Sequence, residues 1–164
     1  MSLSSAERDA LIRRYAEGPA KVRAAWEKVP EAARAWRPGP GKWSAHEIVC
    51  HCGDAEANAA MRIRYLAAEK EPLIIGYDQD AWATTLDYAG HPWEPALALM
   101  DAARASTVAL LRRMPDSLWS RRGRHTESGE YSAEDWLRIY AEHLEKHAAQ
   151  IERTRSAWEA SQAR

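Results

Sequence analysis

The sequence lacks phenylalanine altogether and has only two cysteines, Cys50 and Cys52. Eight tryptophans and six tyrosines supply the large aromatic side chains instead, so the predicted core is not poor in apolar surface. The two cysteines stand two positions apart in a segment that we expect to be helical, where their side chains diverge and cannot easily bridge. The cysteine content therefore excludes a disulfide framework and suggests small apolar filler.

Long apolar runs and an excess of one charge are also missing. No segment approaches the roughly 18 apolar residues of a membrane span, and charges between Ser4 and Glu17 interrupt the apolar stretch that a signal peptide would need. The 23 basic and 24 acidic residues give a formal net charge of -1, too small to gather nucleic acid or an anionic membrane surface. We therefore expect a cytoplasmic protein with no nucleic-acid or membrane partner.

Length and composition favour one helical domain over residues 1–164. Long stretches without glycine or proline predict an all-α protein, with a break or kink at Gly18-Pro19 and a loop over Arg121–Gly129. The connection from Glu69 to Pro92 is long enough to run the length of a bundle, so the helices on either side of it could lie parallel. Apolar periodicity predicts four long helices, over residues 5–28, 44–68, 93–113 and 132–160.

Two of these helices begin with capping boxes. Ser44 can accept a hydrogen bond from the backbone N–H three residues on, while the Glu47 side chain reaches back. Ser132 and Asp135 repeat the arrangement at the start of the last helix. The first of these starts places His51 in the second turn of its helix.

Three histidines lie on the apolar faces of two helices. His143 and His147 are four residues apart, so their rings can point at one place. His51 lies at the inward edge of its helix, and a site of three imidazoles would leave coordination positions open for water or substrate. The alternative is three buried neutral rings, each hydrogen-bonded separately. Spacing alone leaves both interpretations open, because it does not show that the two helices meet at these residues.

The H-x-x-x-H spacing also occurs in zinc proteases, where glutamate directly follows the first histidine and acts as general base. Here Leu144 follows His143, and Glu145 lies about 200° round the helix from His143. The spacing therefore does not predict a protease, and the sequence identifies no catalytic base.

Three further residues are candidates for the surroundings of such a site. Asp54 lies one turn beyond His51 and could orient its ring, or could be an ordinary surface acid. Arg62 follows the helical line of His51 and could meet an anionic substrate, or extend into solvent. Tyr140 shares the apolar side of the last helix and could line a substrate pocket.

The remaining histidines and the arginine cluster carry weaker signals. His46 lies off the apolar face of its helix, whereas His91 and His125 are expected in loops, where they could at best line an entrance. The arginines at positions 121, 122 and 124 have no interleaved stacking aromatics, which favours a solvated loop over a nucleic-acid site.

Two sequence patterns resemble those of the DinB/YfiT-like superfamily. The run W-S-A-H-E-I that begins at Trp43, followed by His51, Asp54 and Glu56, resembles the signature of its second helix. The H-x-x-x-H-x-x-Q-I run that begins at His143 resembles the pattern of its last helix. The long middle connection fits as well, so the resemblance covers most of the chain. Cys52 departs from it, since the family usually has a larger aliphatic residue there.

The resemblance implies a four-helix bundle with up-down-down-up topology and, frequently, a homodimer. It implies one divalent metal ion, with zinc or nickel favoured, on His51, His143 and His147. The implied function is that of a metal-dependent hydrolase, or of an S-transferase that uses a low-molecular-weight thiol, acting on a small-molecule substrate. The alternative is a bundle that binds or senses a small ligand without turnover and keeps a structural or vestigial metal site.

Overall fold

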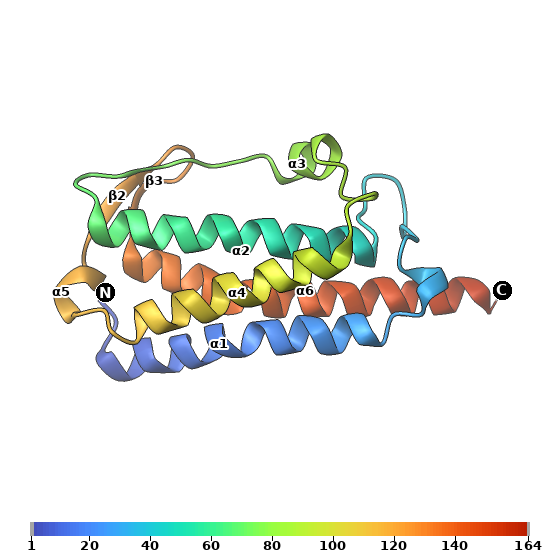
Figure 1. Ribbon diagram of the computed structural model, residues 1–164, viewed down its shortest axis with the longest axis horizontal. Coiled ribbons are helices and arrows are strands. Elements are labelled where there is room, and N and C mark those ends of the chain that lie inside the picture. The colour runs from blue at the N-terminus through green and yellow to red at the C-terminus, as the bar shows by residue number, and fades with distance from the viewer. Residues whose placement is uncertain (1, 164) are drawn as a thin grey trace.

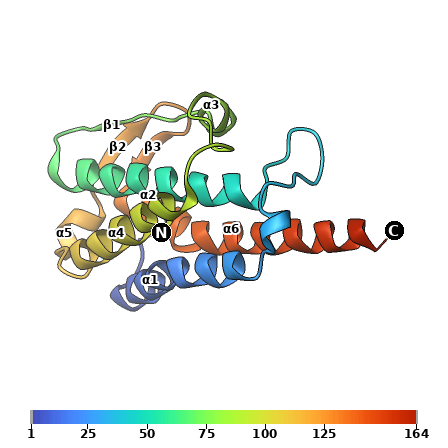
Figure 2. The same ribbon diagram turned by 45° about the vertical axis from the view of Figure 1, so that its right-hand side comes forward.

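The computed structural model describes residues 2–163, and most of them belong to four long helices. These are α1 (Ser5–Glu27), α2 (Ala45–Ala68), α4 (Trp93–Leu111) and α6 (Ala133–Gln162). The helices lie side by side, with α1 and α6 running in one direction and α2 and α4 in the other (Figures 1 and 2). The predicted four-helix bundle with up-down-down-up topology is confirmed.

The connection between α2 and α4 explains the parallel direction of these two helices. It returns along the outside of α2 and contains the short strand β1 (Leu73–Ile74) and the short helix α3 (Gln79–Thr85) (Figure 1). Two further short helices, η1 (Glu31–Ala33) and α5 (Asp116–Trp119), lie in the other connections. No helix of residues 2–163 is long and apolar enough to cross a membrane.

A small sheet occupies the segment that was expected to be a loop. Strands β2 (Arg122–His125) and β3 (Gly129–Ser132) pair antiparallel, and β1 pairs parallel with β2. Gly129 has a φ of 81°, a left-handed conformation that favours glycine, where the chain turns into β3. His125 therefore lies in a strand. The loop prediction was wrong because β2 has little apolar alternation and depends on its partner strands.

Helix α1 continues through Gly18-Pro19 without the expected break. Pro19 has no N–H to donate to the carbonyl of Tyr15, four residues earlier. The guanidinium of Arg104 on α4 donates to that carbonyl over 2.6 Å. A Cβ on Gly18 would lie 2.9 Å from Cβ of Leu144, so glycine allows α1 and α6 to approach closely at this point.

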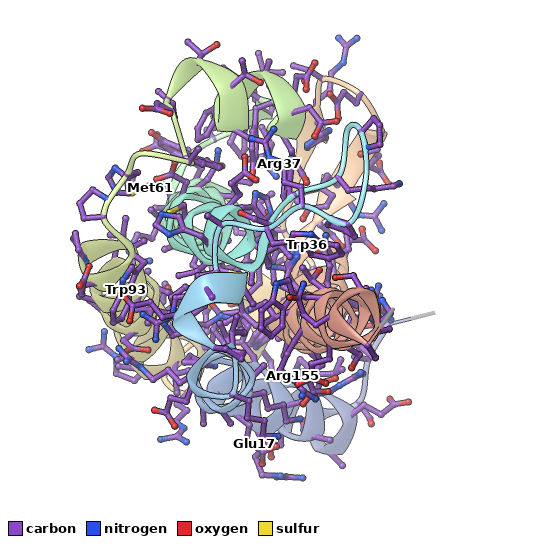
Figure 3. The ribbon with its side chains drawn as sticks, turned by 90° about the vertical axis from the view of Figure 1, so that its right-hand side faces the viewer. Glu17, Trp36, Arg37, Met61, Trp93 and Arg155 are labelled. Carbon is purple, nitrogen blue, oxygen red and sulfur yellow. The ribbon has the colours of Figure 1, made fainter. Side chains whose placement is uncertain are left out.

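Tryptophan fills much of the core, as the composition suggested. Trp136 is fully buried, and its indole N–H donates to the carbonyl of Ala59 over 3.0 Å. Toward the other end of the bundle, the rings of Trp26 and Trp93 lie 5.3 Å apart. Viewed from the C-terminal end of α6, the four helices surround this core (Figure 3).

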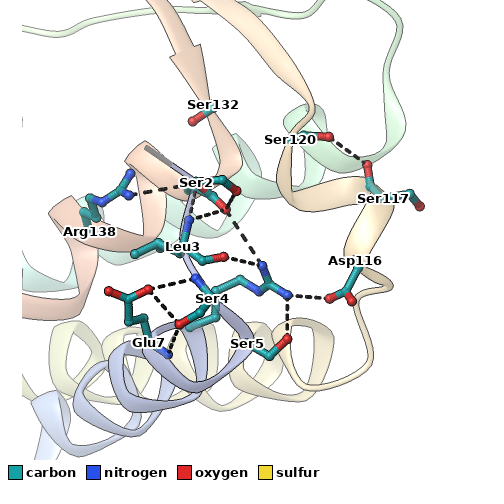
Figure 4. A network of polar contacts seen from close by, with 12 residues as sticks. Ser2, Leu3, Ser4, Ser5, Glu7, Asp116, Ser117, Ser120, Ser132 and Arg138 are labelled. Carbon is teal, nitrogen blue, oxygen red and sulfur yellow. Dashed lines mark hydrogen bonds and ion pairs between the residues drawn. The ribbon is translucent and has the colours of Figure 1, made fainter.

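Polar contacts tie the N-terminal segment to the start of α6 (Figure 4). The hydroxyl of Ser2 and the backbone N–H of Leu3 donate to the carboxylate of Glu134, over 2.9 and 3.0 Å. Arg8 donates to the carbonyl of Leu3 and pairs with Asp116 of α5. These contacts hold the beginning of α1 against α5 and α6.

Candidate metal centre

The two capping boxes set where the helices of the site begin. Ser44 accepts from the N–H of Glu47 over 3.2 Å, and the carboxylate of Glu47 accepts from the N–H of Ser44 over 2.8 Å. Ser132 and Asp135 form the same pair of bonds, of 3.1 and 3.0 Å. Both predicted caps are confirmed, and they set where each helix begins and therefore which of its residues face the core.

The structure brings the three predicted histidines together between α2 and α6. One ring nitrogen from each of His51, His143 and His147 can be chosen so that all three lie within 4.8 Å of one another. The ring of His51 is fully buried and lies 4.7 Å from that of His147, centroid to centroid. His46, His91 and His125 are not part of this cluster among residues 2–163.

Hydrogen bonds orient two of the rings. Nδ1 of His143 lies 3.0 Å from a carboxylate oxygen of Glu56, and Nδ1 of His147 lies 2.9 Å from the amide oxygen of Gln150. Both oxygens are acceptors, so both Nδ1 atoms donate. In the neutral rings the two Nε2 atoms then direct lone pairs at each other across 3.2 Å.

This arrangement fits a metal ion on the ring nitrogens. Two facing lone pairs repel each other, and both nitrogens of the buried His51 ring lack a hydrogen-bond partner. Unpaired buried polar groups cost about 1 to 3 kcal/mol each. A cation bound by the three rings would relieve the repulsion and give one of the two His51 nitrogens a partner, because neutral imidazole is the ligand form of histidine.

Burial keeps two of the rings neutral. Burial, followed by the nearby His147 and His143, lowers the pKa of His51 to about 2. Burial and the neighbouring His143 lower the pKa of His147 to about 4. Both rings are therefore unprotonated at neutral pH, so a metal ion would not have to displace a proton from either.

Behind His143 lies a buried ion pair that the sequence analysis missed. Glu56 accepts from Nε and Nη2 of Arg104, over 2.5 and 2.7 Å, and both side chains are almost fully buried. Burial favours the neutral form of Glu56, but the hydrogen bond from His143 and the charge of Arg104 outweigh it and lower its pKa. Glu56 and Arg104 each stand at a helical spacing from apolar core positions, and this spacing was the sequence signal that both side chains are buried.

The three residues predicted to surround the site have different outcomes. Asp54 accepts from the hydroxyl of Tyr88 over 2.7 Å, and of its two alternative roles the orientation of His51 does not occur, since neither nitrogen of that ring has a hydrogen-bond partner. Arg62 donates over 3.0 Å to the hydroxyl of Tyr140, whose ring lies 5.5 Å from that of His143. Arg62 and Tyr140 therefore lie together beside the cluster, whereas Asp54 belongs to the packing of the crossover connection.

Cys50 and Cys52 are buried and form no disulfide, and the Cys50 thiol donates to the carbonyl of His91 over 3.7 Å. Burial raises the pKa of both thiols, that of Cys50 to about 12, so neither forms a thiolate at neutral pH. Their role as apolar filler agrees with the structure.

A cavity of about 300 Å³ opens onto His147 between the loop that carries Trp43 and the start of α3. Lys42, Gln150 and Asp80 are among its lining residues. A neighbouring cavity of about 370 Å³ shares Lys42, Trp43 and Gln150 with it. The ring of Trp43 covers His51 at 4.9 Å between centroids. Small molecules can therefore approach from the His147 side, while His51 stays shielded.

Curated proteins similar to this chain carry names of candidate metal-dependent hydrolases. One, from Oceanobacillus iheyensis, is 33% identical over 68% of this chain and 64% of its own length, which is less than two thirds of that relative. Another, YfiT of Bacillus subtilis, is 28% identical over 92% of this chain and 85% of its own length.

Solved structures give the same picture of the fold. The structure of YfiT, described as having an unusual four-helix bundle topology, matches with a TM-score of 0.86 at 27% identity, over 93% of this chain and 88% of YfiT. A mycothiol-dependent maleylpyruvate isomerase matches with a TM-score of 0.71 at 11% identity, over 88% of this chain and 60% of that one, which shows the shared fold alone. The DinB superfamily model matches residues 14–151. The chain belongs to the DinB superfamily.

Proposed function

We propose that this protein is a metal-dependent enzyme that uses a divalent ion held by His51, His143 and His147 to activate a nucleophile against a small molecule. The observation that carries the proposal is the pair of Nε2 lone pairs facing each other at 3.2 Å beside a buried ring with no hydrogen-bond partner. The candidate metal-dependent hydrolases among its relatives support the same reading. When bound, the ion supplies a Lewis acid that lowers the pKa of water or of a thiol.

The chain's own residues would hold and orient the reactants. Glu56 and Gln150 keep a proton on each Nδ1, so that both Nε2 atoms stay free for the ion. The hydroxyl of Tyr140 accepts from Arg62, which leaves its own proton available for a substrate oxygen. Burial raises the pKa of Tyr140, so this hydroxyl stays protonated at neutral pH. Trp43 excludes water from the His51 side.

Hydrolysis and the transfer of a low-molecular-weight thiol are the two candidate reactions, and we propose thiol transfer as the first choice. Hydrolysis requires a general base for water, and two carboxylates of α2 are already engaged, Glu56 by Arg104 and His143, and Asp54 by Tyr88. This leaves Asp80, which lines the cavity at His147, as the carboxylate for that role. A free thiol has a pKa of about 8.5 and water one of about 15.7, so a thiol needs far less activation than water to become a nucleophile. The mycothiol-dependent isomerase with the same fold is consistent with this choice.

The metal, the location and the assembly are also proposals. Imidazole ligands suit zinc and nickel, and we propose one of these as the ion. We propose a cytoplasmic homodimer that acts on a small molecule. We propose no nucleic-acid or membrane partner, because the net charge of -1 provides no electrostatic field that would attract either.

Elemental analysis of protein purified without chelators or a histidine tag tests the metal site directly. We expect close to one zinc or nickel ion per chain. Loaded protein is then incubated with low-molecular-weight thiols and an electrophile such as monochlorobimane, which releases chloride as the C–S bond forms, and separately with ester and amide substrates. Saturable thiol conjugation supports the transferase. Ester or amide cleavage without thiol would favour hydrolysis, and stoichiometric binding without product would favour a sensing bundle. Protein free of metal after purification and after titration would end the proposal.

A further inference from the structure

We propose that Arg104 is a positioning residue for the candidate metal site, acting through Glu56 to set which nitrogen of His143 carries the proton. This inference rests on the proposed function, because it assigns a role in preparing His143 as a ligand. It concerns residues on three different helices, with Arg104 on α4, Glu56 on α2 and His143 on α6.

The hydrogen bonds of Glu56 leave its carboxylate one position. Arg104 Nε donates to Oε2 over 2.5 Å and Nη2 donates to Oε1 over 2.7 Å, a two-point contact that fixes both the place and the plane of the carboxylate. The same Oε1 faces Nδ1 of His143 at 3.0 Å. The oxygen that selects the His143 tautomer is therefore held directly by the guanidinium.

Arg104 is itself held by two backbone carbonyls from other helices. Nη1 donates to the carbonyl of Tyr15 over 2.6 Å, and Nη2 donates to the carbonyl of Tyr140 over 3.1 Å. The Tyr15 carbonyl is free because Pro19 provides no N–H to α1 at that point. The proline inside α1 thus creates an acceptor for Arg104, and the guanidinium joins all four long helices at the level of His143.

The inference predicts a specific loss when Arg104 is replaced. In Arg104→Met, Glu56 loses both bonds to the guanidinium and keeps only the long contact of 3.5 Å from the Tyr15 hydroxyl, on Oε2, so Oε1 no longer stays in place opposite Nδ1 of His143. The ring can then carry its proton on Nε2, the nitrogen that faces His147. A proton on that nitrogen competes with a metal ion for the same lone pair.

Arg64→Met is the matched control. Arg64 also joins α2 to α4, donating to the hydroxyls of Thr107 and Ser106 over 3.2 and 2.9 Å. Its third hydrogen bond goes to the carbonyl of Ala60, so among residues 2–163 it bonds neither to Glu56 nor to a histidine. Loss of a helix-bridging arginine is common to both variants, whereas loss of the Glu56 contact is specific to Arg104→Met.

The first measurement is made without metal. Long-range proton–nitrogen NMR spectra of labelled, chelator-treated protein at neutral pH identify the protonated nitrogen of each ring. We expect His143 to carry its proton on Nδ1 in the wild type and in Arg64→Met, and to become a mixture of tautomers in Arg104→Met. His147, bonded to Gln150, should keep its proton on Nδ1 in all three and serves as an internal reference. An unchanged His143 tautomer in folded Arg104→Met would overturn the inference.

The second measurement is zinc affinity, by competition with a chromophoric chelator. Removal of a residue that orients a metal ligand typically weakens binding about 10- to 100-fold, and we expect Arg104→Met to fall in that range while Arg64→Met matches the wild type. Arg104→Lys keeps the charge but cannot make the two-point contact, so its affinity should lie between.

A double variant guards against simple misfolding. Glu56→Leu/Arg104→Met removes both buried charges and the acceptor for Nδ1 of His143, so it should fold even where Arg104→Met does not. Zinc binding as tight as in the wild type would refute the positioning role of the pair. If the wild type binds no divalent ion, the proposed function fails, but the tautomer comparison still decides the role of Arg104.

Discussion

At the scale of single residues, the candidate site depends on which ring nitrogens carry protons. Glu56 and Gln150 each accept a hydrogen bond from an Nδ1 atom. The unprotonated Nε2 atoms of His143 and His147 therefore point their lone pairs at each other. The ring of His51 approaches them from α2 with neither nitrogen bonded. These contacts make the cluster better suited to a cation than to three separately satisfied neutral rings.

Replacing His147 with alanine should remove most of the bound metal, because one of three neutral ligands is lost. The bundle should stay helical, since α6 is anchored by buried apolar residues on either side, among them Leu144 and Ile151. Metal content by elemental analysis and helicity by circular dichroism measure the two effects. His91→Ala, at an exposed position outside the cluster, should keep its metal. Full metal content in His147→Ala would contradict the ligand assignment.

The lowered pKa values of His51 and His147, about 2 and about 4, predict that the metal-free protein loses stability in acid. Above about pH 6.5 the rings are neutral both folded and unfolded, and no stability is lost. Below that, the unfolded chain binds protons that the folded chain refuses. The free energy of unfolding should then fall by about 1.4 kcal/mol per pH unit for each ring, down to its folded pKa.

Urea unfolding of chelator-treated protein at pH 7.5 and pH 5 tests this expectation. His147→Asn removes one of the two groups, so its stability should depend less steeply on pH than that of the wild type. Equal slopes in the two proteins would show that His147 protonates as readily in the folded state as in the unfolded chain.

At the scale of elements, helix starts and close approaches set the register of the site. The capping box at Ser132 begins α6 eleven residues before His143. At Gly53, two residues beyond His51, an added Cβ would lie 2.8 Å from the carbonyl oxygen of Ala96. This glycine lets the backbones of α2 and α4 touch near the candidate site.

Ser132→Ala should lower the free energy of unfolding by about 1 kcal/mol, because the N–H of Asp135 loses its acceptor. Chemical denaturation followed by circular dichroism measures this loss. Ser156→Ala, at an exposed position within α6, is the matched control and should be neutral or slightly stabilising. If the two variants unfolded at the same denaturant concentration, the cap would not be stabilising α6.

Gly53→Ala should be destabilising even though alanine is the better helix former. The new methyl group meets a backbone carbonyl, so α2 and α4 must separate, at a cost of about 1 to 3 kcal/mol. Gly39→Ala, in a loop with nothing within 4 Å of the new Cβ, is the control. Thermal unfolding of both variants provides the comparison, and a Gly53→Ala protein as stable as wild type would rule out the close approach.

At the scale of the whole molecule, one exposed apolar surface is the candidate interface of the proposed homodimer. Met61, Tyr65, Leu73 and Ile75 are each between 45% and 67% exposed and line a shared cavity of about 360 Å³. Sedimentation velocity at micromolar concentration should show a dimer, and Ile75→Glu should convert it to a monomer by placing a charge in this surface. Leu99→Glu, exposed but outside that cavity, should leave the dimer intact. A monomeric wild type would reject the dimer.

The sequence by itself determined the elements that carry the site. Capping boxes and apolar periodicity are local signals, so helix positions, the His143–His147 pair and the inward side of His51 could all be read from residue spacing. The short strands were not predicted for two reasons. β1 pairs with residues about fifty positions away, as Leu73 with Arg124, and β2, although only a short turn separates it from β3, has little apolar alternation.

Only the tertiary structure decided how these elements combine. Sequence spacing could not show that α2 and α6 meet at the histidines, or that Asp54 turns to Tyr88. It also could not join Arg104 to Glu56 and to the carbonyl freed by Pro19, although each residue stood on an apolar stripe. The physical reason is that a buried charge is tolerated only with its partners, and those partners come from other helices through packing of the whole bundle.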